Sequence, residues 1–341
     1  MNETANLIHD AAHRLFSQYV TVDVLNAAEK GVWAEALWEA VEEAGFLDTL
    51  ADADTPAGER AANAAVLLRA AGRHLVPIPL GETVIARAIL VGRGVKAPHG
   101  PISFGVLEGH THTHGDHAHL KGRALRVPYG RHSANVVLSA LGGEEGVLIA
   151  VRRGKLAEGG NVAGEPRDDL VFADTAGTTV AAISGDDLRA YGAVLRAAAM
   201  AGALERILMQ TVEYARTRVQ FGKPIAAFQA IQQQLAVLAG HTAAAGIAAD
   251  AAVGDIEDPA RRSRSAAIAK VRAGEAASAA ASIAHQVHGA IGITKEHSLH
   301  FATRRLYAWR AEFGAEPFWA EKLGRAACGA GAEAYWPSVT G

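Results

Sequence analysis

The first part of the chain has the spacing of apolar residues that is typical of helices. Apolar positions recur at helical intervals over residues 33–47 and again over residues 63–74, so each stretch presents one apolar face. Two prolines and a glycine then break the pattern before it resumes over residues 83–90. We therefore predict a helical domain over residues 1–97.

The middle of the chain changes to short β-prone runs. Four such runs are separated by glycine-rich turns, at residues 102–107, 134–138, 146–151 and 178–183. Short apolar runs between turn residues are typical of strands. The pattern predicts a small antiparallel β-domain over residues 98–185.

Helical periodicity returns for the rest of the chain. Four long periodic stretches follow one another, at residues 187–217, 228–253, 260–288 and 297–310. Long helices joined by short turns favour an antiparallel bundle. The prediction for residues 186–341 is a four-helix bundle, and the whole chain is mainly α with a small β-domain in its middle.

Composition excludes several classes of protein. The chain has 341 residues, half of them hydrophobic, and a formal net charge of −3, which argues against a basic nucleic-acid surface. Cys328 is the only cysteine, so an intramolecular disulfide is impossible and a reducing compartment is expected. The first residues lack a positively charged leader pattern, and no run of about 18 uncharged apolar residues occurs. We expect a cytoplasmic protein without a membrane span.

One turn in the predicted bundle carries residues suited to binding an anion. Arg216 and Arg218 lie at a predicted helix end, where Gly222 can end the helix and Pro224 cannot continue it. A guanidinium there can donate two parallel hydrogen bonds to a diphosphate. The same arginines also fit an ordinary turn, facing the negative end of the helix dipole.

Two residues beside that turn add to its binding capacity. Phe221 can pack on a flat ring system, and Gln229 begins the next helix with a donor and an acceptor to offer. A second segment, residues 286–296, carries glycines three apart at Gly289 and Gly292. Such glycines let backbone N–H groups approach a phosphate or an adenine ring closely, although they also fit a glycine-terminated helix.

Together the two segments resemble the acyl-CoA dehydrogenase family, and the resemblance extends over nearly the whole chain. The turn motif R-x-x-F-G-K-P, with a glutamine seven residues after its glycine, is present at Arg218, Phe221, Gly222 and Gln229. The element Q-x-x-G-x-x-G is present at Gln286, Gly289 and Gly292. The order of helices, β-domain and bundle is also that of the family.

The resemblance implies FAD as the cofactor, bound mainly by a neighbouring subunit that these two segments reach. It implies that Arg218 binds the diphosphate, with Phe221 beside it. The adenosine half of FAD is expected to lie near Gln229 and the segment formed by Gln286, Val287, His288, Gly289 and Ala290.

The β-domain departs from the family pattern. Family members that catalyse alone carry a loop reading roughly T-E-P-x-A-G-S-D, which supports the flavin ring and the thioester. Residues 105–116 hold that place here, and Glu108 is the only recognisable match. A flavin-stacking W-x-T element is likewise replaced, by residues 125–129.

The catalytic base is missing from its usual places. The family reaction removes an α-proton while a hydride leaves the β-carbon, so a carboxylate must face the flavin across the substrate. One family position precedes a glycine after the last bundle helix, and it holds Phe313 here. The other lies early in the helix near Asp187, where the chain has Gly192 and Ala193. Glu312 is the candidate that remains, if this chain carries a catalytic residue at all.

A histidine tract in the β-domain is a candidate metal site. Five histidines lie within ten residues, at His110, His112, His114, His117 and His119. Alternation along a strand would place the first three on one face, and such tracts can bind zinc. Asp116 is the only accompanying carboxylate, and we expect no physiological metal site.

These observations predict a subunit of an FAD-dependent acyl-CoA dehydrogenase, an oxidoreductase that oxidises acyl-CoA thioesters and passes electrons to an acceptor flavoprotein. It is expected to pair with a homologous catalytic chain, because it resembles the partner subunits of heterotetrameric dehydrogenases, including those acting on steroid-CoA thioesters. One alternative is a homomeric dehydrogenase that uses Glu312 or Glu316. The other is a non-enzymatic scaffold or metal-binding protein, against which Arg218, Gln229 and Gln286 argue.

Overall fold

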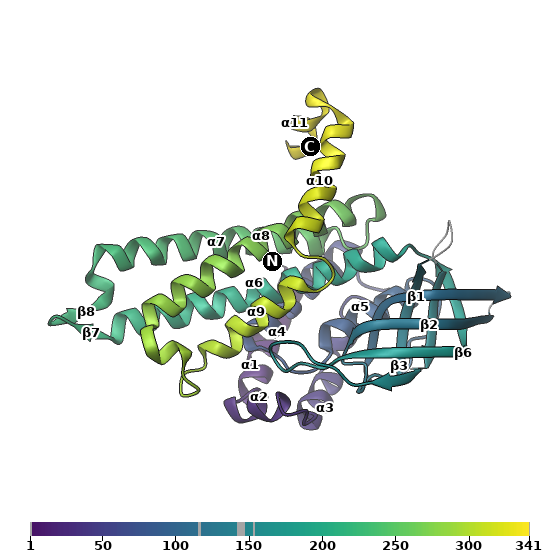
Figure 1. Ribbon diagram of the computed structural model, residues 1–341, viewed down its shortest axis with the longest axis horizontal. Helices are drawn as coiled ribbons and strands as arrows, with labels where there is room; N and C mark the ends of the chain where they lie inside the picture. The colour runs from purple at the N-terminus through teal and green to yellow at the C-terminus, as the bar shows by residue number, and fades with distance from the viewer. Residues whose placement is uncertain (1, 115–116, 142–146, 153, 341) are drawn as a thin grey trace.

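The protein is elongated, with a sheet at one end and a helical bundle that reaches to the other (Figure 1). This computed structural model describes residues 2–114, 117–141, 147–152 and 154–340. The elements follow the predicted order of helices, strands and helices. The fold class is therefore confirmed, while the domain boundaries near residues 97 and 185 stay a prediction.

The N-terminal part is helical, as its apolar periodicity predicts. Its elements are α1 (Glu3–Tyr19), α2 (Val22–Ala28), α3 (Glu35–Glu43), η1 (Phe46–Asp48), α4 (Ala57–His74) and α5 (Leu80–Val91). Asn2 caps α1, because its side chain accepts a hydrogen bond from the Ala5 N–H at 2.7 Å. α4 ends where Leu75 takes a left-handed conformation, with φ at 58°.

Six strands form the middle domain. They are β1 (Ile102–His114), β2 (His117–Pro128), β3 (Asn135–Leu141), β4 (Val147–Arg152), β5 (Lys155–Ala157) and β6 (Arg167–Ala182). The strand order is β2-β1-β3-β4-β6-β5, and an additional pairing of β2 with β6 closes the sheet on itself. Closure leaves few free strand edges in this domain.

One feature of the sheet differs from the prediction. β1 and β3 pair in parallel, with Ile102 opposite Asn135, whereas the predicted sheet was antiparallel throughout. The cause is β2, which the sequence pattern did not reveal. β2 returns antiparallel to β1, so the chain comes back to the end where β1 began, and β3 starts there in the same direction as β1.

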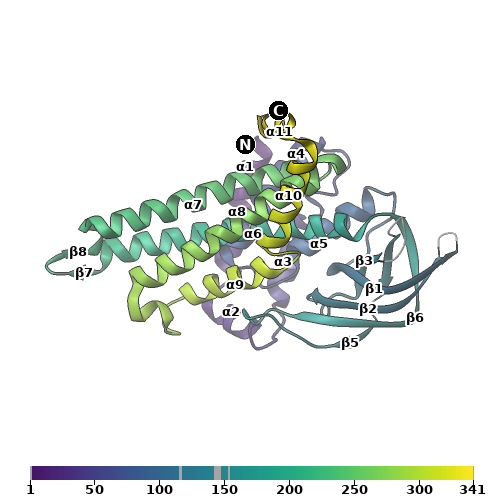
Figure 2. The same ribbon diagram turned by 45° about the horizontal axis from the view of Figure 1, so that its top comes forward.

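The bundle follows the four predicted stretches within a few residues. Its helices are α6 (Gly185–Thr217), α7 (Gln229–Gly254), α8 (Pro259–His288) and α9 (Leu299–Ala311). Ser184 caps α6 by accepting from the Asp187 N–H at 3.0 Å, and Asp258 caps α8 just before Pro259. Two further helices, α10 (Glu316–Ala330) and α11 (Ala332–Thr340), project away from the bundle (Figures 1 and 2).

Close packing of the bundle depends on small residues. α6 and α8 bury long runs of alanine, including Ala197, Ala201, Ala273 and Ala277. Alanine combines high helix propensity with a small side chain, so the two helices form readily and approach closely. The buried alanines place the core of this half of the molecule between α6 and α8 (Figure 2).

α7 is the one helix in the described part of the chain that is long and apolar enough to cross a membrane, at 26 residues. Core helices of soluble proteins meet the same criterion. Leu238, Ala245 and Ala249 of α7 are buried in the clusters that α6 and α8 share. These three residues of α7 therefore contribute to the packing of the bundle.

Candidate functional site

A short hairpin at the end of α6 carries the predicted diphosphate contact. α6 ends at Thr217, and Arg218 follows with its N–H bonded to the Tyr214 carbonyl at 2.8 Å. β7 (Val219–Gln220) and β8 (Lys223–Pro224) then form a hairpin at the extreme of the molecule (Figure 1).

The tip of the hairpin is a tight turn that exposes an aromatic ring. Phe221 and Gly222 both have positive φ, 50° and 78°, as two-residue hairpin turns require. The Ile225 N–H closes the loop by donating to the Arg218 carbonyl at 2.8 Å. Phe221 is 93% exposed, and a phenylalanine that contacts so little of its own chain is available to pack on another group.

Arg218 and Gln229 flank this hairpin, and both side chains are exposed. Gln229 begins α7, after η2 (Ile225–Ala227). In the part of the chain that the structure describes, Arg218 forms no ion pair with a carboxylate. A guanidinium at the negative end of α6 with free donors suits an anion supplied from outside this chain.

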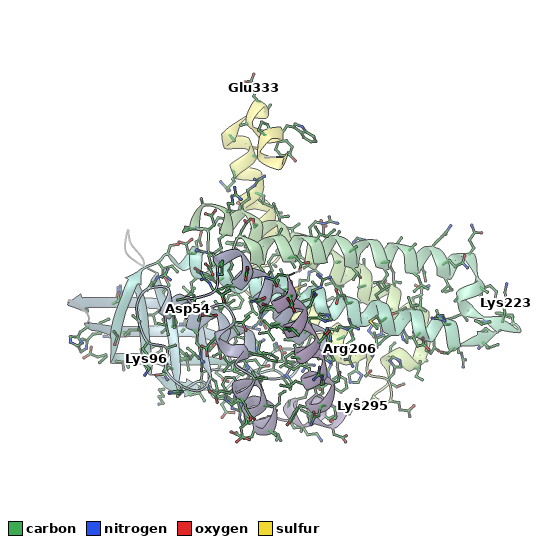
Figure 3. All side chains as sticks on the ribbon, turned by 180° about the vertical axis from the view of Figure 1, so that it is seen from behind. Asp54, Lys96, Arg206, Lys223, Lys295 and Glu333 are labelled. Carbon is green, nitrogen blue, oxygen red and sulfur yellow. The ribbon has the colours of Figure 1, made fainter. Side chains whose placement is uncertain are left out.

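The second predicted segment lies at the same end of the bundle. α8 ends at His288, Gly289 has a φ of 63°, and η3 (Gly289–Ile293) follows. The His288 ring stacks on Tyr214 with centroids 4.5 Å apart, and Tyr214 lies one turn before Arg218 in α6. Lys223 on the hairpin and Lys295 after η3 both lie on the side away from the sheet (Figure 3).

The side chains of this second segment differ in exposure. Gln286, Gly289 and Ala290 are exposed, whereas Val287 and His288 are buried. No atom lies within 4 Å of the position that a Cβ would take on Gly289. The exposed Gln286 amide and the backbone after His288 are therefore open to a ligand, as the motif predicts.

His288 itself has one nitrogen without a partner. Its Nδ1 lies 2.7 Å from the Ala284 carbonyl and donates to it, which leaves Nε2 as the acceptor. Nε2 is buried and has no hydrogen-bond partner among the described residues. Burial lowers the pKa of His288 below the usual histidine value, so the ring is neutral at pH 7. Buried acceptors in proteins are usually hydrogen-bonded, so the His288 Nε2 has room for a donor from outside the described residues.

The two positions at which the family places its base lie next to each other in the fold. The aromatic ring of Phe313 lies between them. Phe313 follows α9 with a φ of 54°, and Gly314 follows with a φ of 97°. A Cβ on Gly192 would lie only 2.2 Å from Cδ1 of Phe313. Phe104 of β1 contacts the same ring, with centroids 5.4 Å apart. The Phe313 ring therefore fills the space above Gly192.

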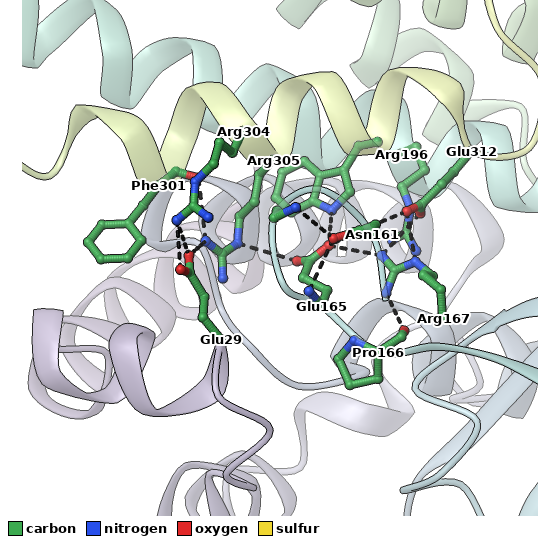
Figure 4. A network of polar contacts seen from close by, with 12 residues as sticks. Glu29, Asn161, Glu165, Pro166, Arg167, Arg196, Phe301, Arg304, Arg305 and Glu312 are labelled. Atoms are coloured by element: carbon green, nitrogen blue, oxygen red, sulfur yellow. Dashed lines mark hydrogen bonds and ion pairs between the residues drawn. The ribbon is translucent and has the colours of Figure 1, made fainter. Parts of the chain in front are cut away.

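Glu312 points away from that space into a buried ion-pair network (Figure 4). Its carboxylate accepts from Arg167 Nε at 2.7 Å, Arg196 Nε at 2.5 Å and Asn161 Nδ2 at 3.1 Å. Burial by itself would raise the pKa of Glu312, but Arg167 and Arg196 outweigh it and lower the pKa to about 2. Glu312 is an anion at neutral pH, held by two arginines.

The network extends beyond Glu312 to four other parts of the fold. Glu165 contacts Arg167 at 2.9 Å and Arg305 at 3.3 Å, and it accepts from the Trp309 indole at 2.9 Å. Glu82 of α5 binds Arg196 of α6 at 2.7 Å. The network therefore ties the β-domain to α6 and α9 (Figure 4), and Glu82 extends it to α5.

Little open volume remains beside this network. The cavity there measures about 40 Å³ and is lined by residues of the network and of the α4–α6 contact, among them Gly72, Glu82, Tyr129, Arg167, Arg196 and Ala199. Small-molecule sites in proteins usually measure roughly 300–1,000 Å³. An acyl thioester does not fit this space in the structure described.

The β-domain segment that replaces the family's flavin loop is a regular hairpin of β1 and β2. Glu108 lies opposite Arg123 in the ladder, and their side chains are 3.5 Å apart. His112 lies opposite His119, which contacts Asp174 at 3.0 Å. Among the described residues, no group of three histidines, cysteines or carboxylates could hold a metal. Asp116 and the side chain of His114 lie outside the described residues.

Known proteins similar to this chain are acyl-CoA dehydrogenases. The family model of the acyl-CoA dehydrogenase C-terminal domain matches residues 190–326. The acyl-CoA dehydrogenase IpdE2 of Mycolicibacterium smegmatis is 29% identical over 320 residues, which cover 90% of this chain and 93% of that protein. These matches support an acyl-CoA dehydrogenase family member. IpdE2 of Mycobacterium tuberculosis is 45% identical over 116 residues, 34% of this chain and 35% of that protein.

Solved structures of the family share the fold. A chain of the Tcur3481-Tcur3483 steroid ACAD superposes with a TM-score of 0.86 at 23% identity, covering 95% of this chain and 97% of that one. A chain of the ChsE4-ChsE5 complex from Mycobacterium tuberculosis superposes with a TM-score of 0.82 at 22% identity, with the same coverage. The acyl-CoA dehydrogenases are FAD-dependent oxidoreductases, so the predicted family and enzyme class agree with these comparisons.

The sequence did not reveal the residues that surround Glu312. Asn161, Arg167 and Arg196 lie far from Glu312 in the chain and share no motif with it. The one local signal is the Phe313-Gly314 pair, which turns the backbone after α9. Whether Arg218, Gln229 and residues 286–290 contact FAD stays a prediction.

Proposed function

We propose that this chain is the non-catalytic, FAD-contacting subunit of a hetero-oligomeric acyl-CoA dehydrogenase. The observation that carries the proposal is Phe313, which stands at one family position of the base and fills the space above Gly192, the other position. A chain with phenylalanine at one position and glycine at the other has no carboxylate at either family position of the base.

Neither nearby glutamate replaces the missing base. A general base works best with a pKa near the operating pH, whereas the pKa of Glu312 is about 2 and two arginines hold its carboxylate. Glu316 is paired with Arg310 and lies against Gly274. These surroundings disfavour the homomeric alternative.

The exposed end of the bundle suits one half of an FAD site. Arg218 would bind the diphosphate, Phe221 would pack on a ring, and Gln229 would contact the adenosine half together with residues 286–290. Three observations support this fit: among the described residues the Arg218 guanidinium has no carboxylate partner and the His288 Nε2 has no hydrogen-bond partner, and the backbone at Gly289 is open. When bound, FAD accepts the hydride that leaves the β-carbon of the acyl group.

The other half of the site has to come from a second chain. The β1–β2 hairpin replaces the loop that supports the flavin ring in self-sufficient members. We therefore infer a homologous catalytic partner that supplies the flavin-ring contacts and the base, with an electron-transferring flavoprotein as acceptor and the cytoplasm as location. Relatives described as steroid dehydrogenases and as a two-chain complex favour a bulky acyl-CoA substrate and a hetero-oligomer.

The experiment that tests this proposal compares the lone chain with the chain co-expressed with a homologous catalytic partner. We expect the lone chain to retain little FAD after gel filtration and to oxidise no acyl-CoA. The co-expressed complex is expected to be yellow and to carry fewer flavins than chains. Robust turnover by the lone chain reconstituted with FAD, abolished in a Glu312→Gln variant that circular dichroism shows to be folded, would instead establish the homomeric enzyme.

A single substitution tests the diphosphate contact. Arg218→Ala in the complex removes a charged, bidentate donor, a loss of roughly 1.5–3 kcal/mol in FAD binding. We expect a sharp fall in the FAD that the purified complex retains, with the unfolding midpoint of the lone chain unchanged. Arg325→Ala on α10 is the matched control, since Arg325 pairs only with Glu321 of its own helix among the described residues. Full FAD retention in Arg218→Ala would refute the assignment.

A further inference from the structure

A sizeable cavity lies away from the proposed FAD half-site. It measures about 690 Å³ and lies among α1, α4, α6 and α7. Residues Ala65, Arg69 and Arg73 of α4 line it, whereas the small cavity beside the Glu312 network is lined by Leu68, Ala71 and Gly72. The two cavities therefore lie on different faces of α4.

Small side chains on one helix create this cavity. The wall that α4 contributes is a stripe of small residues, namely Gly58, Ala61, Ala62, Ala65, Val66 and Ala70, and α6 adds Leu208 and Met209. Leucines at the same α4 positions would fill the space. A volume of this size with mostly apolar walls is typical of sites that hold small organic molecules.

The two arginines that line the cavity lie one turn apart on α4 and differ in their partners. Arg69 is neutralised, because its Nε donates to Glu205 at 2.6 Å and its Nη1 to Asp250 at 2.7 Å. Arg73 has only a weak acceptor, the Met209 sulfur, at 2.9 Å from Nη2. No carboxylate among the described residues pairs with Arg73.

One further cation, Arg206, lies beside Arg73, whereas the histidines there add no charge. His13 lines the cavity and hydrogen-bonds His74 at 2.7 Å, and burial lowers the pKa of each ring to about 4, so both rings are neutral at pH 7. Arg206 uses one of its nitrogens on the Arg73 carbonyl at 3.3 Å. A guanidinium with five donors and no anion, at the mouth of an apolar cavity, calls for a ligand with a negatively charged head.

We propose that this cavity binds an amphipathic carboxylate, with its apolar body against the α4 stripe and its carboxylate on Arg73. Arg73 lines the cavity and pairs with no carboxylate among the described residues, so it fits a single negative charge. Glu205 and Asp250 neutralise Arg69. The orientation follows, since Arg73 is left to bind the head group.

A competition titration on the full-length protein tests the proposal. Saturable binding of cis-parinaric acid is followed by its fluorescence, and dodecanoic acid and dodecanol are compared as competitors. These two share a chain length and differ in charge. We expect the acid to displace the probe at a concentration roughly tenfold lower than the alcohol, as a charged hydrogen-bonded pair would give.

Two variants distinguish the contribution of the cavity to ligand binding from that of the Arg73 guanidinium. Arg73→Gln is expected to remove the preference for the acid while leaving displacement by dodecanol unchanged. Ala65→Phe fills the cavity and should abolish saturable binding of the probe. If the unfolding temperature of Ala65→Phe, measured by circular dichroism, is much lower than that of the unaltered protein, Ala62→Phe is used instead. Arg325→Gln serves as the charge-matched control on α10 and should behave as the unaltered protein.

The opposite outcomes are equally clear. Equal displacement by acid and alcohol, or an acid preference that persists in Arg73→Gln, would overturn the assignment of the head group. Probe binding that survives both Ala65→Phe and Ala62→Phe, or no saturable binding at all, would overturn the site.

Discussion

Glu312 and Phe313 are adjacent in the chain and have opposite surroundings. Phe313 adopts a left-handed backbone conformation, which costs roughly 1–2 kcal/mol for a residue with a Cβ. The turn sends the Glu312 carboxylate to Arg167 and Arg196, and the Phe313 ring against Gly192. Buried ion pairs and ring packing together offset the strain, so these two residues close the place where a base would act.

Glu312→Gln tests the structural role of this carboxylate. Removing one charge from a buried pair leaves Arg167 and Arg196 without full compensation, which typically costs about 3–5 kcal/mol. We expect the free energy of unfolding, measured by urea titration at pH 7, to fall by that order. Glu321→Gln on the surface of α10 is the control and should change it little. A loss no larger than the control's would show that the network contributes nothing.

The stability difference between the unaltered protein and Glu312→Gln is expected to depend on pH. Because the folded pKa of Glu312 is about 2, below its ordinary value of 4.5, its ionised form stabilises the folded state. That contribution is complete above the unfolded pKa and is lost as pH falls from 4.5 towards 2. The stability gap between the unaltered protein and Glu312→Gln should therefore narrow across that window. A gap that stays constant would contradict the lowered pKa.

At the scale of elements, the contact of α4 with α6 is made backbone to backbone. A Cβ on Gly72 would lie 2.1 Å from the Ala199 carbonyl oxygen, and one on Gly202 would lie 2.0 Å from the Arg69 carbonyl oxygen. Glycine at both positions lets the two helix axes approach closely. The contact also explains why the cavity beside the Glu312 network is so small.

Gly72→Ala tests this contact. The added methyl group meets backbone atoms that cannot move independently of a helix, so we expect a loss of about 1–3 kcal/mol, as for other overpacked cores. Gly240→Ala on α7 is the matched control, because no atom lies within 4 Å of its Cβ position. That change should raise stability by roughly 0.5–1 kcal/mol through helix propensity. Denaturant titration of both variants measures these changes in the free energy of unfolding. An equal gain in both would show that α4 and α6 can move apart to accept the methyl group.

At the scale of the whole molecule, the β1–β2 hairpin and the β7–β8 hairpin lie at opposite ends (Figure 1). The proposed FAD contacts belong to the end with β7 and β8. The histidine tract belongs to the end with the sheet. Substitutions at the two ends should therefore act independently, since distant sites without shared partners usually contribute additively.

Replacing the five histidines between His110 and His119 by asparagine tests that separation. We expect FAD content and turnover of the assembled complex to stay nearly unchanged, whereas Arg218→Ala at the other end lowers both. Flavin absorbance of the purified complex and a dye-reduction assay supply the two measurements. A large drop in turnover that zinc restores would instead assign a metal site to the tract.

Local patterns in the sequence determined most of the architecture of this protein. The four bundle helices and the helical N-terminal part follow from apolar periodicity over long stretches, because a helix depends on residues three and four apart. The sequence indicated a turn near Gly222 but not its form, because α6 ends at Thr217 and Gly222 lies at the tip of the β7–β8 hairpin instead of ending the helix. The sequence also placed Phe313 before Gly314 after the last bundle helix.

The tertiary structure alone decided what those residues meet. Glu312 binds Arg167 and Arg196, which precede it by 145 and 116 residues, and no spacing rule links positions so far apart. The parallel pairing of β1 with β3 depended on a strand whose alternation was hidden among histidines. The contact of Phe313 with Gly192, the closure between α4 and α6 and the cavity at Arg73 likewise exist only where separate helices pack together. Periodicity in a single sequence shows which face of a helix or strand is apolar. It does not show which other element packs against that face.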